Sequence, residues 1–210
     1  MTYKILFSFI IEVLLLSGCK SGHSTKDTSR SGTPETNQGQ KVIQDDRLHQ
    51  AALNGNYSEV ISLLTGNRDV NMKDQDGRTA LMYASYNGHT EIVKELLNKG
   101  AKINLRDQNG RTALMFAASG PFPETVKLLL ENKAEPDLAD GEEHYTALMY
   151  AAAEGQLEIV RILLNGRADP TLKDVDGDNA VTFANSNGHK EVADLIMSYI
   201  KGQTGTQKNQ

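Results

Sequence analysis

The sequence has only one cysteine, Cys19, so no disulfide can form within the chain. It also has no surplus of positive charge: 22 Lys and Arg stand against 27 Asp and Glu, and the net charge is -5. A protein that neutralises nucleic-acid phosphates needs Lys and Arg clustered on one face. We therefore expect no nucleic-acid partner.

The chain also lacks an apolar run that is long enough to cross a bilayer, which requires about 20 residues. A shorter run follows Lys4 and occupies residues 5–16, ahead of the small residues Ser17 and Gly18. This order of a basic residue, a short apolar stretch and small residues is typical of a secretory signal peptide, not of a membrane span.

The residues Leu16, Ser17, Gly18 and Cys19 resemble the lipobox of bacterial lipoproteins. This resemblance implies that residues 1–18 are removed and that the thiol of Cys19 carries diacylglycerol. Acyl chains bind a bilayer with about 0.8 kcal/mol per buried CH₂. We therefore expect a lipid-anchored protein of the bacterial cell envelope. Lys20 stands where Asp would retain it at an inner membrane, which favours the outer membrane in a Gram-negative host; the side of the membrane stays open.

Two segments contain hardly any large apolar residues. Residues 20–44 consist mainly of Ser, Thr, Gly, Gln and Lys, and residues 202–210 have a similar composition. Such segments cannot bury enough apolar surface to offset the entropy of ordering the chain. We predict a flexible tether over residues 19–44 and a disordered tail over residues 202–210.

Between these segments the chain repeats itself. Asp recurs at positions 74, 107, 140 and 174, at spacings of 33, 33 and 34 residues, and a single inserted residue precedes Tyr145. Self-similarity at this period is typical of a repeat architecture. The spacing predicts five units, at residues 45–77, 78–110, 111–144, 145–177 and 178–201.

Each unit carries the signals of two short helices and a turn. Side chains that can cap the first helix are Asp46, Thr79, Thr112, Thr146 and Asn179. Glycines that can end it are Gly55, Gly88, Gly155 and Gly188. Acidic residues that favour the start of the second helix are Glu91, Glu124, Glu158 and Glu191. Asp at the start and Gly at the fourth position then predict a turn at residues 74–77, 107–110 and 174–177.

A 33-residue unit of two helices and a turn resembles the ankyrin repeat, and the resemblance covers about residues 45–201. The segments RTALMYAS and GHTEIVKELLNKGAKIN carry it most clearly. The resemblance implies an all-α solenoid in which each unit buries its apolar face only by stacking on its neighbours. Met82, Met115 and Met149 stand where the family has a histidine, so a hydrogen bond to the neighbouring repeat is expected only at His49.

In the ankyrin family the turn tips and both ends of the first helix line a concave face that grips partner proteins. The resemblance therefore assigns protein binding to a set of residues in repeats two to five. The assigned residues are Gln75, Asp76, Arg78, Tyr86, Asn87, Gln108, Asn109, Arg111, Ser119, Glu142, Glu143, Tyr145, Ala153, Glu154, Val175, Asp176, Asp178, Ser186 and Asn187.

Charge is unevenly distributed along the repeats. Residues 45–133 contain 11 acidic and 11 basic residues, whereas residues 134–200 contain 13 acidic and 4 basic ones. This gradient predicts a protein partner that is basic where it meets repeats four and five, drawn in by long-range attraction. The competing interpretation is that the acidity only keeps a monomeric array soluble.

The sequence has little that indicates chemistry. No pair of histidines has metal-ligand spacing on one face. A calcium loop starting at Asp174 would need Gly at its sixth position, but Gly177 is the fourth. No serine elbow or phosphate-binding glycine loop is present, and the Met and Tyr residues of the TALMYA segments are expected in the core. We expect no enzyme, cofactor or metal. The alternatives are a structural envelope lipoprotein without a tight partner and, less favoured, a hydrolase or metal-dependent enzyme.

Overall fold

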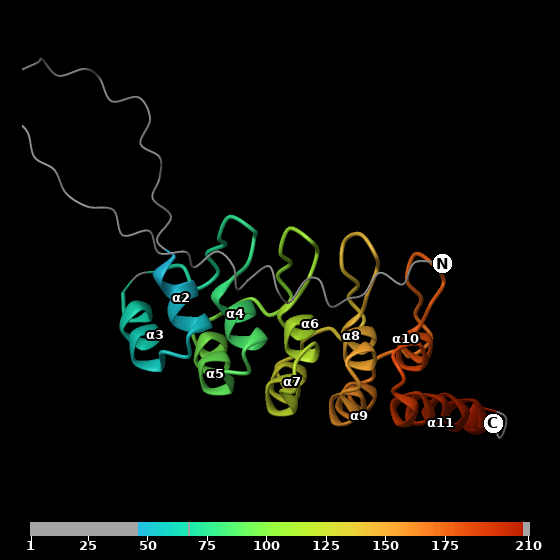
Figure 1. Ribbon diagram of the computed structural model, residues 1–210. Helices are drawn as coiled ribbons and strands as arrows, with labels where there is room; N and C mark the ends of the chain where they lie inside the picture. The colour runs from blue at the N-terminus through green and yellow to red at the C-terminus, as the bar shows by residue number, and fades with distance from the viewer. Residues whose placement is uncertain (1–45, 67, 208–210) are drawn as a thin grey trace, which may run out of the picture. The chain divides into compact units, whose positions relative to one another are not determined.

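The structure is a computed structural model that describes residues 46–66 and 68–207, and the regular secondary structure of these residues consists of helices joined by loops (Figure 1). The inner helices are α2 (Arg47–Leu53), α4 (Ala80–Tyr86), α6 (Ala113–Ala118), α8 (Ala147–Ala153) and α10 (Ala180–Ser186). The outer helices are α3 (Tyr57–Leu64), α5 (Thr90–Asn98), α7 (Pro123–Glu131), α9 (Leu157–Asn165) and α11 (Lys190–Gln207). The predicted all-α solenoid is confirmed.

The helices form two parallel rows, and a row of loops projects on the side of the inner helices (Figure 1). Each inner helix packs on its own outer helix and on the next inner helix, so that α4 contacts α5 and α6. This layout follows from neighbour-only stacking, in which the core is a continuous layer between the rows.

Equivalent positions of successive repeats form that core. In the inner helices small residues allow close approach, and Ala84, Ala117, Ala151 and Ala184 are all fully buried. In the outer helices larger residues fill the layer, and these are Leu96, Leu129, Leu163 and Ile196. All of them are 0% exposed, because each is covered by its own repeat and by a neighbouring one.

The predicted helix caps are confirmed in four repeats and wrong in the first. The hydroxyl of Thr79 accepts the backbone N–H of Met82, the same bond recurs at Thr112 and Thr146, and Asn179 accepts from two backbone N–H groups. The Asp46 side chain makes no cap, because its backbone lies near helical values (φ -78°, ψ 8°) instead of the extended conformation that turns a cap side chain toward the helix.

The methionines that replace the family's histidine have a structural role that the sequence did not reveal. The sulfur of Met82 lies 3.4 Å from the backbone nitrogen of Thr79 and accepts its N–H, and the same contact recurs in the next two repeats. These buried methionines therefore complete a reciprocal capping box. His49 Nε2 lies 2.9 Å from the carbonyl oxygen of Met72. Met72 lies within the predicted first repeat, so this bond is made inside that repeat and the predicted hydrogen bond to a neighbouring repeat is wrong.

The third repeat has the sequence Gly-Pro-Phe-Pro where the second and the last have Gly-His, and the structure shows how the fold accommodates it. Pro123 occupies the first turn of α7, where its missing N–H costs nothing. The Phe122 ring packs against Gly88 of the preceding repeat, so tightly that any side chain at Gly88 would overlap it. His89 packs in the same way against Gly55.

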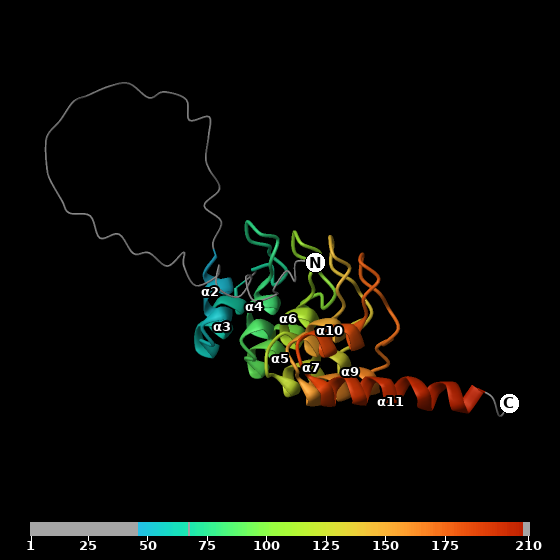
Figure 2. The same ribbon diagram turned by 45° about the vertical axis from the view of Figure 1, so that its right-hand side comes forward.

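The predicted boundary of the C-terminal tail is wrong, because α11 continues past residue 202 to Gln207 and extends beyond the other outer helices (Figure 2). Gly202 is not among the glycines with positive φ, and no proline follows it, so nothing interrupts the helical hydrogen bonding. Residues 208–210, like the predicted signal peptide, Cys19 and the tether, lie outside the described residues. No helix in the described part of the chain is long and apolar enough to span a membrane.

Candidate protein-binding surface

The loops between repeats are four fingers, at residues 74–78, 107–111, 140–145 and 174–178, and an aspartate organises each one. In the second finger the Asp107 N–H donates to the Arg111 carbonyl oxygen, while Asp107 Oδ1 accepts the backbone N–H groups of Asn109 and Arg111. Asp74 and Asp174 make the same bonds. The finger aspartates therefore determine the shape of the loops.

The finger of repeat four is longer by the predicted insertion. Its Asp140 N–H donates to the Tyr145 carbonyl oxygen, and Asp140 Oδ1 accepts the Tyr145 N–H at 3.0 Å. The extra residue is accommodated because His144 adopts a left-handed conformation, with φ at 62°. The insertion enlarges the loop without disturbing its aspartate.

Backbone hydrogen bonds join neighbouring finger tips. Gln108 N–H donates to the Asp76 oxygen at 2.9 Å, and Gly141 N–H donates to the Asn109 oxygen at 2.7 Å. The last link is 3.2 Å long, from Val175 N–H to the oxygen of Glu143. The tips therefore form one continuous edge, along the row of loops in Figures 1 and 2.

The predicted binding residues differ in how far they reach solvent. Those with exposed side chains are Gln75, Asp76, Gln108, Asn109, Glu142, Val175, Asp176, Ser186 and Asn187. Those that are partly buried are Arg78, Tyr86, Asn87, Arg111, Ser119, Glu143, Tyr145, Glu154 and Asp178. Ala153 does not fit the prediction, because it is only 8% exposed; its methyl group at the end of α8 is too short to reach past its neighbours.

Several polar groups of this set are already engaged inside the array. Asn87 Nδ2 donates to the Leu53 carbonyl oxygen at 2.6 Å, which ties repeat two to repeat one. Ser119 Oγ donates to the Phe116 oxygen within its own helix. Arg111 donates two hydrogen bonds to Asp107 Oδ2. These polar groups therefore stabilise the fold itself.

A row of aromatic rings lies along the inner helices, and it was not predicted from the sequence, which placed only the tyrosines of the TALMYA segments in the core. The row consists of Tyr83, Phe116, Tyr150 and Phe183, all half-buried. Tyr145 packs edge-on against two of them, with ring centroids 6.0 Å from Tyr150 and 5.1 Å from Phe183. Spacings of 33, 34 and 33 residues were the signal in the sequence that marks this row.

Burial raises the pKa of two tyrosine hydroxyls near the fingers. It is the main cause that raises the pKa of Tyr83 to about 12, and the hydrogen bond from its hydroxyl to Asp74 Oδ2 adds to this. Burial also raises the pKa of Tyr145 to about 12, with further contributions from carboxylates that include Glu143 and Asp174. Tyr83 is therefore a neutral hydrogen-bond donor at physiological pH, and Tyr145 presents a neutral ring beside acidic groups.

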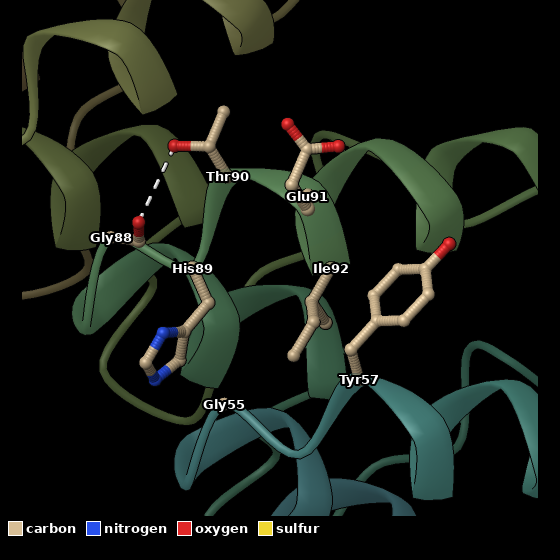
Figure 3. Close-up of a pocket in the computed structure, with 7 residues that line it drawn as sticks. All are labelled: Gly55, Tyr57, Gly88, His89, Thr90, Glu91 and Ile92. Atoms are coloured by element: carbon tan, nitrogen blue, oxygen red, sulfur yellow. Dashed lines mark hydrogen bonds between the residues drawn. The ribbon is translucent and has the colours of Figure 1, made fainter.

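A shallow pocket of about 660 Å³ lies away from the fingers, at the starts of α3 and α5 (Figure 3). Its lining residues are Gly55, Tyr57, Gly88, His89, Thr90, Glu91 and Ile92. The ring of His89 is already bonded to the Leu53 carbonyl oxygen, and the Thr90 hydroxyl donates to Gly88. None of the predicted binding residues lines this pocket, and no metal-binding group of three side chains occurs in residues 46–66 and 68–207.

Comparison with known families agrees with this architecture. A family model described as ankyrin repeats, in three copies, matches residues 48–140 and 122–209. The chain belongs to the ankyrin repeat family. No curated protein matched the sequence. Ankyrin repeats are typically non-enzymatic interaction scaffolds, so the array is a protein–protein interaction module.

Proposed function

We propose that this ankyrin chain is a lipid-anchored protein of the bacterial cell envelope that recruits or protects a partner protein. The partner binds the finger-tip face, the surface formed by the tips of the four fingers at residues 74–78, 107–111, 140–145 and 174–178. The lipobox-like residues that end at Cys19 support the anchor. The continuous edge of hydrogen-bonded finger tips supports the binding role, because it holds exposed side chains from several repeats in a rigid order.

The proposed partner is basic where it meets repeats four and five. Glu142 and Asp176 are exposed on the tips there, and Glu154 lies at the end of α8. Burial raises the pKa of Glu154, an effect that His189 partly offsets. An acidic surface of this kind accelerates the association of a basic partner more than it strengthens the final complex.

Binding is tested by crosslinking and pull-down from native envelopes with the mature protein as bait. We expect Glu142→Lys with Glu154→Lys to slow association and to weaken its salt dependence. Lys94→Glu is the control on an outer helix and should have little effect. Equal association rates for the double variant and the parent at low salt would show that the acidity serves only solubility. Capture of no partner by the parent would favour the structural lipoprotein.

Anchoring is tested separately by metabolic lipid labelling. Cys19→Ala removes the thiol that would be acylated, so we expect an unlabelled precursor that keeps residues 1–18. Ser17→Ala is a matched control that leaves the thiol in place and should still be labelled. Labelling of the Cys19→Ala protein at the level of the parent would contradict the proposed anchor.

A further inference from the structure

The second and the last finger have the same backbone arrangement around a buried aspartate. Asp107 is 7% exposed and Asp174 is 8% exposed. Asp174 Oδ1 accepts the backbone N–H groups of Asp176 at 3.0 Å and Asp178 at 2.7 Å, as Asp107 Oδ1 does in its own loop. In both fingers the turn uses one carboxylate oxygen and leaves the other available.

The other oxygen has a side-chain donor in three of the four fingers. Arg111 Nε and Nη2 lie 3.0 and 2.9 Å from Asp107 Oδ2. The hydroxyls of Tyr83 and Tyr150 donate to Asp74 Oδ2 and Asp140 Oδ2 at 2.6 and 2.9 Å. A buried carboxylate is stabilised by such donors, since the loss of its hydration is otherwise uncompensated.

The last finger lacks every one of these donors. The position of Arg111 is occupied by Asp178 and that of Tyr83 and Tyr150 by Phe183, and neither side chain can donate as an ionised acid or a hydrocarbon. In the described part of the chain, no group donates a hydrogen bond to Asp174 Oδ2. Asp174 Oδ2 is not completely enclosed by the protein, so it is accessible to solvent.

The preceding repeat offers no cation either. Arg78 of repeat two reaches forward to the next finger, where its Nε lies 3.9 Å from Asp107 Oδ2. The corresponding residue before the last finger is Tyr145, whose ring packs on Phe183. Asp107 thus has two guanidinium groups near it, whereas Asp174 has an aromatic pair and a second carboxylate.

We propose that Asp174, Asp178 and the rings of Tyr145 and Phe183 form a receptor for an arginine side chain of the partner protein. The second finger shows the arrangement that the partner would reproduce, since the Arg111 guanidinium pairs with Asp107 and lies 4.7 Å above the centroid of the Phe116 ring. The acidity of residues 134–200 adds long-range attraction for such a group.

Arginine fits this receptor better than lysine does. Its planar guanidinium can donate two parallel hydrogen bonds to one carboxylate while stacking on a ring, and it is less strongly hydrated than an ammonium group. The inference rests on the proposed function, because it requires a protein partner that binds the finger-tip face.

The receptor is tested without the partner by titrating the mature protein with N-acetyl-arginine amide and recording backbone amide NMR spectra. The Asp176 and Asp178 amides report binding because they donate to Asp174. We expect saturable shifts of these amides and at least about tenfold weaker binding of the neutral citrulline analogue. Citrulline binding as tight as that of arginine would overturn the proposal.

Asp178→Arg is the decisive variant, because it places a guanidinium where repeat three has Arg111. We expect it to pair with Asp174, to raise the unfolding temperature and to abolish the arginine-dependent shifts. Asp194→Arg makes the same change of charge at an exposed position of α11 and should keep binding. Equal loss of binding in both variants would mean general attraction and no receptor.

Pull-down separates the two proposals. Partner capture by the parent and by Asp194→Arg, with loss in Asp178→Arg, supports the receptor. Equal capture by all three chains overturns it and leaves the proposed function standing. Capture by none of them contradicts the proposed function, and the arginine titration then still decides whether the receptor exists.

Discussion

The fingers that lead into repeat three and into the last repeat differ in how their aspartate is paired. Asp107 and Asp174 are both buried, and in both fingers Oδ1 holds the loop. Repeat three pairs the second oxygen with its own Arg111, whereas the last repeat has Asp178 at that position. The comparison shows that the turn needs only one of the two carboxylate oxygens. The second oxygen can accept hydrogen bonds within the protein, or it can be left available to bind another molecule.

The largest expected difference between these repeats lies in their cores. Leu129 of repeat three and Ile196 of the last repeat occupy equivalent positions and are both 0% exposed. Truncation to Ala at either site should cost about 2 to 5 kcal/mol in free energy of unfolding. We expect Leu129→Ala to cost more, because an interior repeat stacks on two neighbours. Urea unfolding measures both variants. A larger loss for Ile196→Ala would contradict neighbour-only stacking.

The second difference concerns the aspartate pairs. Arg111→Ala removes the two charge-assisted hydrogen bonds to Asp107, whose side chain alone is 1% exposed, and it should lower the free energy of unfolding by about 2 to 3 kcal/mol. Asp178→Ala removes no side-chain hydrogen bond and should change stability by less than about 0.5 kcal/mol. Thermal and urea unfolding of the two variants test this contrast directly. Similar losses in both would mean that the Asp107 pair does not stabilise the finger.

A third experiment removes a tyrosine hydroxyl from one finger and adds one to another. Tyr150→Phe leaves Asp140 Oδ2 without its hydroxyl donor and should lower the free energy of unfolding by about 1.5 kcal/mol. Phe183→Tyr places a hydroxyl opposite Asp174 and should add about 1 kcal/mol, because a tyrosine makes this bond in two other fingers. Chemical unfolding should therefore show effects of opposite sign. Two effects of the same sign would argue against equivalent fingers.

The smallest expected effect concerns repeat two. Ser85 is 0% exposed, and its hydroxyl has no hydrogen-bond partner among the described residues. Repeats three and four have Ala118 and Ala152 at the same position, both fully buried. Ser85→Ala removes an unsatisfied polar group and should raise stability by about 0.5 to 1 kcal/mol. Ser119→Ala is the control in which an existing hydrogen bond is lost. A fall in stability on Ser85→Ala would reveal a partner for the hydroxyl.

Short-range sequence signals predicted the helix starts well where the capping residue and its hydrogen-bond partner are close together in the sequence. Thr79 caps a backbone N–H only three residues away, so the helix start could be inferred from the cap residue alone. The prediction was wrong at Asp46, because a capping side chain needs an extended backbone and the backbone of Asp46 is not extended. It was also wrong after residue 202, where a glycine that does not turn the chain lets the helix continue.

The sequence by itself determined the all-α solenoid, since each 33-residue unit carries the signals of two helices and can bury its apolar stripes only by stacking on its neighbours. Only the tertiary structure decided which polar groups are already paired. Arg78 and Arg111 are the same residue type at equivalent positions in the sequence, yet Arg111 donates two hydrogen bonds to the aspartate of its own finger, whereas Arg78 Nε lies 3.9 Å from the aspartate of the next finger. Pairing depends on contacts within about 3 Å between side chains that packing places, and the order of residues along the chain does not specify these distances.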